Sequence, residues 1–393
     1  MTPTDNPAMS DVAGHVDLFD PNQSPPALEV LDYARENCTL LRTDADAGYY
    51  IAARYDDVRS MALETDAFSS VEAGLRGIPI PMPPLTVDPP VHGEYRKQLN
   101  PYLSRAFLSR YEGDVRQIAQ DMLDRLVPAG RMDFMADFAA PFTARALSRA
   151  ILDDDNEERI DRAAEITRGI ATENSVEAFF GMAALAEELL RERADAGNER
   201  DDVLTAIVRA TVEGRPLTME EQVGFTAVLM NGGLDTTKGA MGNIILRMAA
   251  DPSIEERLRD PGWIKGDLDE FLRLDSPIQF MARTVTKETE LGGCPLKEGD
   301  RVAIHFASAN RDPRKFDRPD ELVFGRERNP HVAFGVGSHR CIGIHFAKMQ
   351  MEVGFAELLS RVTNIRIPAG AEPEMSSGVV VAPEHLPIEF DLR

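Results

Sequence analysis

Residues 334–343 read Phe334-Gly-Val-Gly-Ser-His-Arg-Cys341-Ile-Gly343, a glycine-punctuated loop that delivers one cysteine to an apolar helix. Its two internal glycines allow backbone conformations and close approaches that a side chain would block, so main-chain N–H groups can point at a bound sulfur. The helix predicted over 342–360 places its positive dipole end at Cys341, which favours thiolate over thiol. A thiolate held in this way is a metal ligand or a nucleophile.

A single cysteine in such a loop could also have one of two simpler roles. A lone cysteine before a helix is commonly a small buried hydrophobic residue. Zinc binding is the second alternative because His339 and His345 flank Cys341, but no other cysteine lies nearby and the spacing is not that of a zinc site. The complete pattern of the loop decides between these alternatives and a cofactor site.

That pattern, Phe-Gly-x-Gly-x-His-x-Cys-x-Gly, is matched at every fixed position and resembles the haem-binding loop of the cytochrome P450 superfamily. The resemblance implies that Cys341 is the metal ligand, an axial thiolate to the iron of haem b. It implies further that Phe334 packs beside the sulfur and that His339 reaches a haem propionate, with Gly343 in the same cofactor-binding loop.

The composition predicts a soluble, globular protein. The chain has 393 residues, 43% of them hydrophobic, and its three cysteines provide no disulfide framework and fit a reducing compartment. A net charge of −23 argues against a nucleic-acid partner, because phosphate contacts need clustered Lys and Arg. The N-terminus lacks the pattern of a signal peptide, and the charge-free run 223–234 is too short to span a bilayer. We therefore expect a cytoplasmic monomer without a membrane partner, with a flexible arm over 1–24 and a single domain over 25–393.

A second set of residues is suited to an anionic ligand. After Asp88-Pro-Pro, the i, i+4 spacing places His92 and Arg96 on one face of a predicted helix. Taken alone, such a pair is more often a solvated surface feature. Asp-Pro-Pro-x-His-x-x-x-Arg, however, resembles the segment of the same family that binds haem propionates, and Arg283 matches the family's second propionate-binding arginine.

A long helix is predicted from a capping box at 218–221 to about residue 250. Two adjacent glycines in its middle cost about 1 kcal/mol each relative to alanine. Close helix packing would account for them. The segment Gly-Gly-Leu-Asp235-Thr236 also resembles the family's oxygen-activating motif, which implies that Asp235 and Thr236 are a catalytic acid–alcohol pair.

The region 71–90 combines glycines and prolines, which forbid regular structure, with apolar side chains that need burial. It is either a loop lying on the core or a wall of the substrate pocket, and the resemblance favours the wall. Later positions are assigned to the same pocket on the resemblance. The expected wall residues are Ile78, Ile80, Met82, Leu85, Gly233, Ile278, Phe280, Val379 and Val380.

The pair Glu270 and Arg273 has the i, i+3 spacing of an ion pair on a helix predicted over 267–274. A single Glu-x-x-Arg is common by chance. Beside the other motifs it resembles the family's structural Glu–Arg pair, and either Arg318 or Arg326 would complete its network.

The remaining pattern is mainly helical. Helices are predicted over 55–63, 111–127, 138–151, 156–171, 176–195 and 202–212, and strands over 39–42, 48–52, 301–306, 377–381 and 386–392. The resemblance implies a mostly α fold, a helical prism with a smaller β-rich lobe. It places haem between the helix of Asp235 and the loop of Cys341.

The resemblance also implies a monooxygenase that inserts one atom of O2 into a small or medium hydrophobic substrate, terpenoid or aromatic, by hydroxylation or O-dealkylation. Electrons would come from a ferredoxin and its NAD(P)H-dependent ferredoxin reductase, with docking at a cluster of basic residues. That cluster is Arg96, Lys97, Arg105, Arg110, Arg340 and Lys348. Two alternatives are a non-catalytic haem-thiolate sensor and a peroxide-using hydroxylase, and the pair Asp235 and Thr236 speaks against the second.

Overall fold

The computed structural model describes residues 12–24, 26–173, 175–195, 200–260, 262 and 266–393. Residues 1–11, part of the expected arm, lie outside the described residues. The remainder of that arm is packed against the body of the protein. Val16 and Leu18 are buried, and the hydroxyl of Thr43 donates to the carbonyl of Val16 over 2.8 Å.

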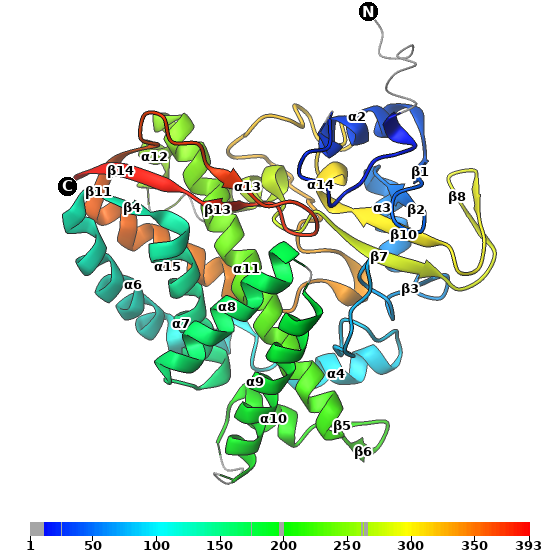
Figure 1. The fold of residues 1–393 in the computed structure, drawn as a ribbon, viewed down its shortest axis with the longest axis horizontal. Coiled ribbons are helices and arrows are strands. Elements are labelled where there is room, and N and C mark those ends of the chain that lie inside the picture. Colours follow the sequence, from blue (N-terminus) through cyan, green and yellow to red (C-terminus); the bar gives the residue numbers. More distant parts are fainter. Residues whose placement is uncertain (1–11, 25, 174, 196–199, 261, 263–265) are drawn as a thin grey trace, which may run out of the picture.

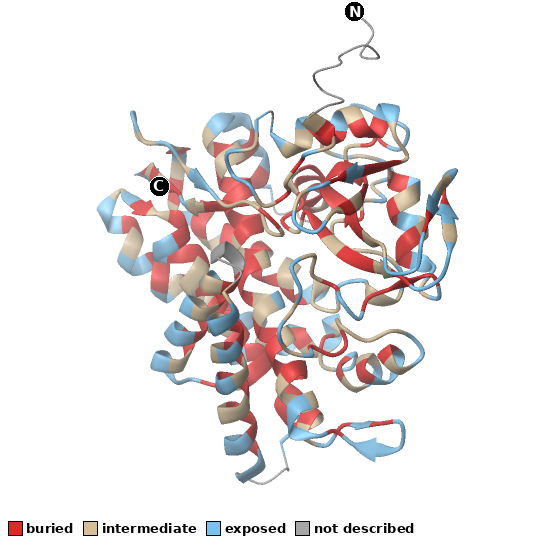
Figure 2. Ribbon diagram, turned by 45° about the vertical axis from the view of Figure 1, so that its right-hand side comes forward, coloured by how far each residue is buried: buried red, intermediate tan, exposed pale blue. Residues whose placement is uncertain are grey.

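Helix α11 (Met219–Ala250) runs through the centre of the helical part (Figure 1). The predicted capping box begins it, because Thr218 Oγ1 accepts from the N–H of Glu221 while the Glu221 carboxylate accepts from the N–H of Thr218. Other helices cover α11 on several sides and bury most of its circumference (Figure 2). They are α7 (Ala140–Leu147), α8 (Glu157–Glu173), α9 (Val176–Asp195), α10 (Val203–Val208), α12 (Pro252–Leu258), α13 (Asp267–Asp275) and α15 (Ile344–Arg361).

The β-rich lobe is built on a five-stranded sheet. Its strand order is β1 (Leu40–Thr43), β2 (Tyr49–Ala52), β10 (Arg301–His305), β7 (Phe280–Val285) and β3 (Phe68–Ser69). Strand β10 runs parallel to β2 and antiparallel to β7, with Val302 opposite Arg283. Helices α2 (Ala27–Asn37) and α3 (Tyr55–Leu63) bury apolar side chains against this sheet.

Smaller elements complete the body. Helix α6 (Glu112–Leu126) packs against α15, and a second sheet has the order β11 (Val362–Arg366), β14 (Pro387–Leu392), β4 (Arg131–Asp133). Helices α4 (Val91–Leu99) and α5 (Arg105–Leu108) follow the proline-rich region. The expectation of a mostly α fold with a smaller β-rich lobe is confirmed (Figure 1).

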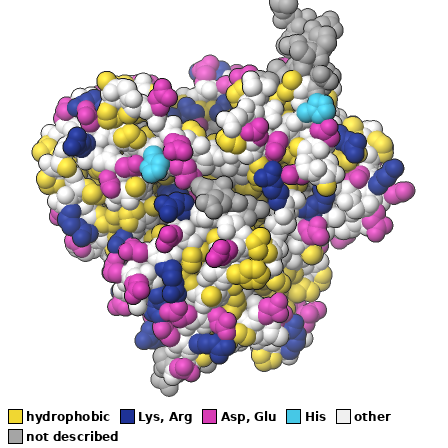
Figure 3. Space-filling view, in the orientation of Figure 1, with side chains coloured by type: hydrophobic (Ala, Val, Ile, Leu, Met, Phe, Trp, Pro, Cys, Tyr) yellow, Lys and Arg dark blue, Asp and Glu magenta, His cyan; other side chains and the backbone are white. Residues whose placement is uncertain are grey.

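The surface mixes the two signs of charge. Acidic and basic side chains are interspersed over the face shown in Figure 3, so the net charge of −23 is not gathered there into one acidic field. No helix among the described residues is both long and apolar enough to cross a membrane.

Two predicted helices differ from the structure at their ends. The helix expected over 138–151 is flanked by π-helical turns, so that helical backbone begins at Phe134 and ends at Leu152. The helix expected over 202–212 ends at Val208, and the residues from Thr211 onward form a short hairpin that turns at Glu213 and Gly214, whose φ angles are 52° and 74°.

The strand predicted over 377–381 is wrong. Gly378 has a φ of 90° and sits against Phe19, where an added Cβ would come within 2.9 Å of the ring. The chain therefore turns there, and the residues of the expected strand contribute only an isolated bridge between Ile278 and Val380. The strands of this region are β12 (Glu374–Met375) and β13 (Pro383–His385).

Candidate active site

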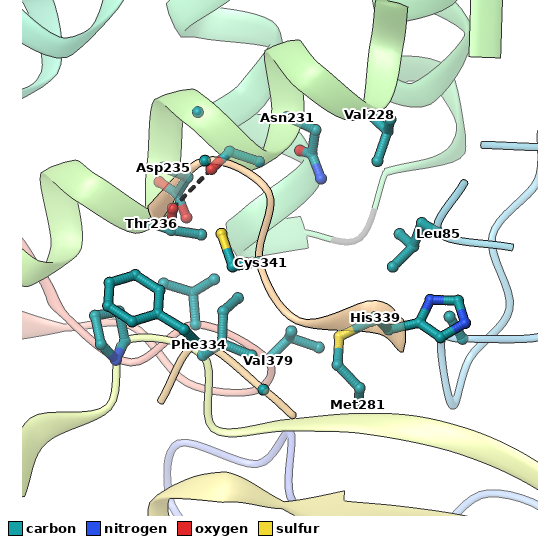
Figure 4. Close-up of a pocket in the computed structure, with 18 of the residues that line it drawn as sticks. Leu85, Val228, Asn231, Asp235, Thr236, Met281, Phe334, His339, Cys341 and Val379 are labelled. Atoms are coloured by element: carbon teal, nitrogen blue, oxygen red, sulfur yellow. Dashed lines mark hydrogen bonds between the residues drawn. The ribbon is translucent and has the colours of Figure 1, made fainter. Parts of the chain in front are cut away.

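A cavity of about 460 Å³ lies between α11, the cysteine loop, the proline-rich region and the start of β7. Figure 4 shows Asn231, Asp235 and Thr236 on one side of it and Cys341 and Phe334 facing them from the loop. Cys341 is exposed to this cavity. The structure therefore brings the cysteine and the acid–alcohol pair, which lie about a hundred residues apart in the sequence, to one enclosed space.

The cysteine loop has the strained backbone that its glycines permit. Gly335 and Gly337 have φ angles of 67° and 77°, and a Cβ on Gly337 would come within 2.8 Å of the Ala62 carbonyl in α3. The N–H of Cys341 donates to the carbonyl of Phe334 over 2.8 Å, which closes the loop. Only glycine fits these two positions, so the loop's spacing is a packing requirement as well as a motif.

The electrostatics at Cys341 suit a bound cation. Burial raises the pKa of its thiol, and the N–H of Gly343 and the charges of Arg96 and Arg340 oppose that rise only in part. The helix end therefore does not by itself make a thiolate here. A metal cation bound to the sulfur would supply the missing stabilisation, because coordination deprotonates a thiol outright.

Four donor side chains gather beside the loop, and none of them forms a hydrogen bond or ion pair with a carboxylate among the described residues, although the charge of Asp88 acts on His92 and Arg283. The ring centroids of His92 and His339 lie 4.2 Å apart, and burial lowers the pKa of His92 to about 4 and that of His339 to about 3. Arg283 is buried, with a pKa that burial lowers to about 10, and its Nη1 donates to the Ala282 carbonyl over 2.7 Å. Arg96 donates to the Arg340 carbonyl over 2.7 Å.

This donor set fits the propionates of a haem. His339 Nε2 is buried and has no hydrogen-bond partner among the described residues, and both His339 and Arg283 line the cavity. A buried cation and an orphaned ring nitrogen are costly unless an anion reaches them. His92 and Arg96 do not line the cavity themselves but lie directly behind it, against His339 and the cysteine loop.

Helix α11 presents the acid–alcohol pair to the cavity. The Thr236 hydroxyl donates to the Gly232 carbonyl over 2.7 Å, shown as a dashed line in Figure 4. Asp235 Oδ1 lies 2.6 Å from Lys238 Nζ, and both side chains are largely buried. Burial also raises the pKa of Glu384 in β13, against the opposing charge of Lys238. Asp235, Lys238 and Glu384 thus form a series of charged groups that leads from the cavity wall to β13.

The glycine pair of α11 combines close helix packing with a place in the cavity wall. A Cβ on Gly233 would come within 2.7 Å of Leu147 in α7, so this glycine permits close helix packing. Gly232 has open space at that position, and both glycines line the cavity.

Most of the expected wall residues line the cavity. They are Ile78, Met82, Leu85, Gly233, Ile278, Phe280, Val379 and Val380. Ile80 is the exception and the prediction for it is wrong, because its side chain packs against the main hydrophobic core instead. The backbone next to it is fixed by α11, since an added Cβ on Gly224 would overlap the Pro81 carbonyl.

The structural ion pair forms, and its third member is Arg326. Arg273 is fully buried and binds both carboxylate oxygens of Glu270 at 2.8 and 2.9 Å. Arg326 Nε lies 2.9 and 3.0 Å from the same two oxygens. Arg318 has a positive φ of 47° and directs its side chain to surface partners, Asp317 and Glu321.

Several lining residues were not predicted from the sequence. Asn231 and Val228 precede the glycine pair on α11, and Met281 and Phe179 come from β7 and α9. Helical spacing could have found Asn231, because it lies one turn before Asp235. Arg76 also lines the cavity, but its guanidinium is paired with Asp17 and Asp46.

The zinc alternative finds no support, since no group of three or more potential ligand side chains occurs in the described part of the chain.

Comparisons with known proteins agree with this site. A family model described as Cytochrome P450 matches residues 266–390. Probable cytochrome P450 127A1 of Sinorhizobium fredii is 32% identical over 340 residues, covering 85% of this chain and 81% of the relative. Linalool 8-monooxygenase of Pseudomonas putida is 27% identical over 358 residues, covering 85% and 88%. The crystal structure of CYP108D1 from Novosphingobium aromaticivorans superposes with a TM-score of 0.85 at 25% identity, covering 98% of both chains. On these similarities, this chain belongs to the cytochrome P450 family of haem-thiolate monooxygenases, whose cofactor is haem b.

Proposed function

We propose that this monooxygenase oxidises a small or medium apolar molecule, terpenoid or aromatic, with electrons delivered by a ferredoxin. The observation that carries the proposal is the single enclosed cavity shared by Cys341, the pair Asp235 and Thr236, and a largely apolar wall. Haem b bound there supplies the activation of O2 and the transfer of one oxygen atom to the substrate.

The cofactor would be held from two sides. Cys341 would be the ligand to the haem iron, and its position is fixed by the Gly335 and Gly337 turns and by the hydrogen bond to Phe334. His92, Arg96, Arg283 and His339 are the proposed partners of the propionates, because none of these donors forms a hydrogen bond or ion pair with a carboxylate among the described residues. Neutralising the propionates in this way avoids the cost of burying uncompensated charge.

The acid–alcohol pair would manage protons at the oxygen-binding side. The Thr236 hydroxyl is held by the Gly232 carbonyl and presents its oxygen to the cavity. Asp235 is held by Lys238, which also faces Glu384. We propose that protons reach Thr236 from this group, with Asp235 as the residue that passes them on.

The substrate class follows from the lining. The expected wall residues that line the cavity are apolar, and the basic side chains that reach it are engaged: Arg76 with two carboxylates and Arg283 with the proposed propionate cradle. A carboxylate substrate would therefore lack a free cation there. The relative named linalool 8-monooxygenase acts on a small terpenoid, which supports the same class here.

The electron donor would dock beside the cysteine loop. Lys97, Arg105 and Arg340 are exposed there, and none of them has an ion-pair partner among the described residues. The expected cluster is smaller than the sequence suggested, because Lys348 pairs with Asp269 over 2.6 Å and Arg110 lies 3.9 Å from Asp201. Three exposed cations, on α4, on α5 and in the cysteine loop, still suit an acidic ferredoxin.

One experiment tests the core of the proposal. The dithionite-reduced, carbon-monoxide-treated protein should show the red-shifted Soret band of a thiolate-ligated haem, and Cys341→Ala should lose it. Turnover with a ferredoxin, its reductase and NAD(P)H then separates a monooxygenase from a sensor with the same spectrum. A peroxide-using enzyme would make product with hydrogen peroxide and not with the reductase system.

A further inference from the structure

Asn231 places an amide in an otherwise apolar part of the cavity wall. Its side chain lines the cavity one turn of α11 after Val228, and Figure 4 shows it directed inward beside Val228 and across from Leu85. Within the described residues it has no hydrogen-bond or ion-pair partner. The nearby polar groups are engaged elsewhere, since Thr236 donates to the Gly232 carbonyl and Asp235 pairs with Lys238.

The Asn231 amide is partly buried and faces the cavity, so its hydrogen-bonding groups are open to whatever fills that space. Its carbonyl accepts and its NH2 donates, so it can bind either a hydroxyl or a carbonyl oxygen. An apolar ligand would displace water from this amide without replacing its hydrogen bonds, whereas a ligand oxygen would replace them. Neutral oxygens suit it better than charged groups, because Arg76 and Asp235 already have partners.

We propose that Asn231 is a specificity-determining residue, which holds a neutral hydroxyl or carbonyl oxygen of an otherwise apolar, terpenoid-sized substrate. This inference rests on the proposed monooxygenase function and narrows its substrate class to singly oxygenated molecules. Leu85, Val228 and Met281 contact the apolar body of such a molecule from the surrounding wall.

The position of Asn231 also restricts where oxidation occurs. It lies five positions before Thr236 along α11, a rise of about 7.5 Å. A substrate anchored at Asn231 therefore turns a carbon several bonds away from its own oxygen toward the oxygen-activating pair. The product carries two separated oxygens rather than an oxidised form of the group already present.

The test compares three compounds with one carbon skeleton: p-menthane, menthol and menthone. Dissociation constants come from titrations of the haem spin-state change in wild type, Asn231→Leu and Val228→Leu. Wild type is expected to bind menthol and menthone about fivefold to tenfold more tightly than p-menthane. Asn231→Leu should lose that preference, while Val228→Leu, an apolar change one turn away, should keep it.

Each of the other possible outcomes overturns either the role of Asn231, the proposed substrate class or the proposed function. An equal preference in wild type and Asn231→Leu overturns the role of Asn231, and no spin-state change with any of the three compounds overturns the substrate class. The carbon-monoxide spectrum distinguishes these failures from a failure of the function itself. A wild-type protein without the thiolate band overturns the function and the inference together, whereas a normal band with unselective binding overturns the inference alone.

Discussion

The rings of His92 and His339 lie with their centroids 4.2 Å apart, although one comes from α4 and the other from the cysteine loop. Both rings have lowered pKa values because burial disfavours their charged forms. Two neutral donors and the buried Arg283 thus form a site that is incomplete without an anion. Because the proposed cradle includes residues of both α4 and the cysteine loop, we expect haem binding to depend on the packing of α4 against that loop.

Arg283→Leu is expected to weaken haem retention by roughly tenfold, because it removes a buried cation from the propionate cradle. The measurement is the rate of haem transfer to excess apomyoglobin. Arg301→Leu is the matched control, since Arg301 lies beside Thr284 on the neighbouring strand and pairs with Glu72 outside the cavity. Equal transfer rates for the two variants would remove Arg283 from the cradle.

Lys238→Met is expected to lower kcat at least fivefold and to enlarge the solvent deuterium isotope effect, because Asp235 loses the amine 2.6 Å away that holds its carboxylate. KM should change little, since Lys238 does not line the cavity. Lys238→Arg keeps a cation at this position and should retain most of the rate. An unchanged isotope effect in Lys238→Met would show that this pair does not take part in proton delivery.

The motifs were predictable because they are local. The capping box, the two glycine turns before Cys341 and the Glu270–Arg273 spacing each need only a few consecutive residues, and all of them form as predicted. The misses depend on contacts between distant segments. Whether Ile80 reaches the cavity depends on how Pro81 meets Gly224, and the turn at Gly378 depends on Phe19. The choice between Arg318 and Arg326 was open because it depends on the backbone angle at Arg318.

Arg326→Ala is expected to destabilise the protein by about 3 kcal/mol, because it leaves part of the buried charge of Glu270 unpaired. The denaturant midpoint for loss of the Soret band reports this change. Arg318→Ala is the matched control and should cost at most about 0.5 kcal/mol, since that side chain is 54% exposed. Similar midpoints for both variants would contradict the assignment of Arg326 to the network.

His305 makes stability depend on pH. Its ring is buried beside Arg35, its Nδ1 accepts from the N–H of Ser308, and burial lowers its pKa to about 3. In the unfolded chain the imidazole has a pKa of about 6.5. Between about pH 3 and pH 6.5 the unfolded state therefore binds more protons than the folded state. The free energy of unfolding should therefore fall below about pH 6.5, by at most about 1.4 kcal/mol per unit.

The comparison with His305→Asn isolates this effect, because an asparagine oxygen can still accept from Ser308 but does not titrate. The stability advantage of wild type over the variant should shrink from pH 7 to pH 5. The other histidines titrate in both proteins and cancel in the difference. A constant difference over this pH range would mean that His305 stays neutral in the unfolded state as well, or is charged in both states.

Charge reversal at Arg105 tests where the electron donor docks. Arg105 is exposed on α5, which packs against α15, the helix that follows the loop of Cys341, and it has no ion-pair partner among the described residues. Arg105→Glu and Lys97→Glu should each lower ferredoxin-driven turnover about threefold or more at low ionic strength, and the fall of turnover with added salt should become shallower.

Arg340 is adjacent to Cys341 in the chain, but its charge also acts on the Cys341 thiol, so reversing it would mix an effect on docking with an effect on the thiol. Arg42→Glu, an exposed change of the same charge on strand β1 at the far edge of the sheet, serves as the control (Figure 1). Substrate affinity should stay the same in all three variants. If Arg105→Glu, Lys97→Glu and the control all show the same turnover at low and at high salt, the donor docks on another face.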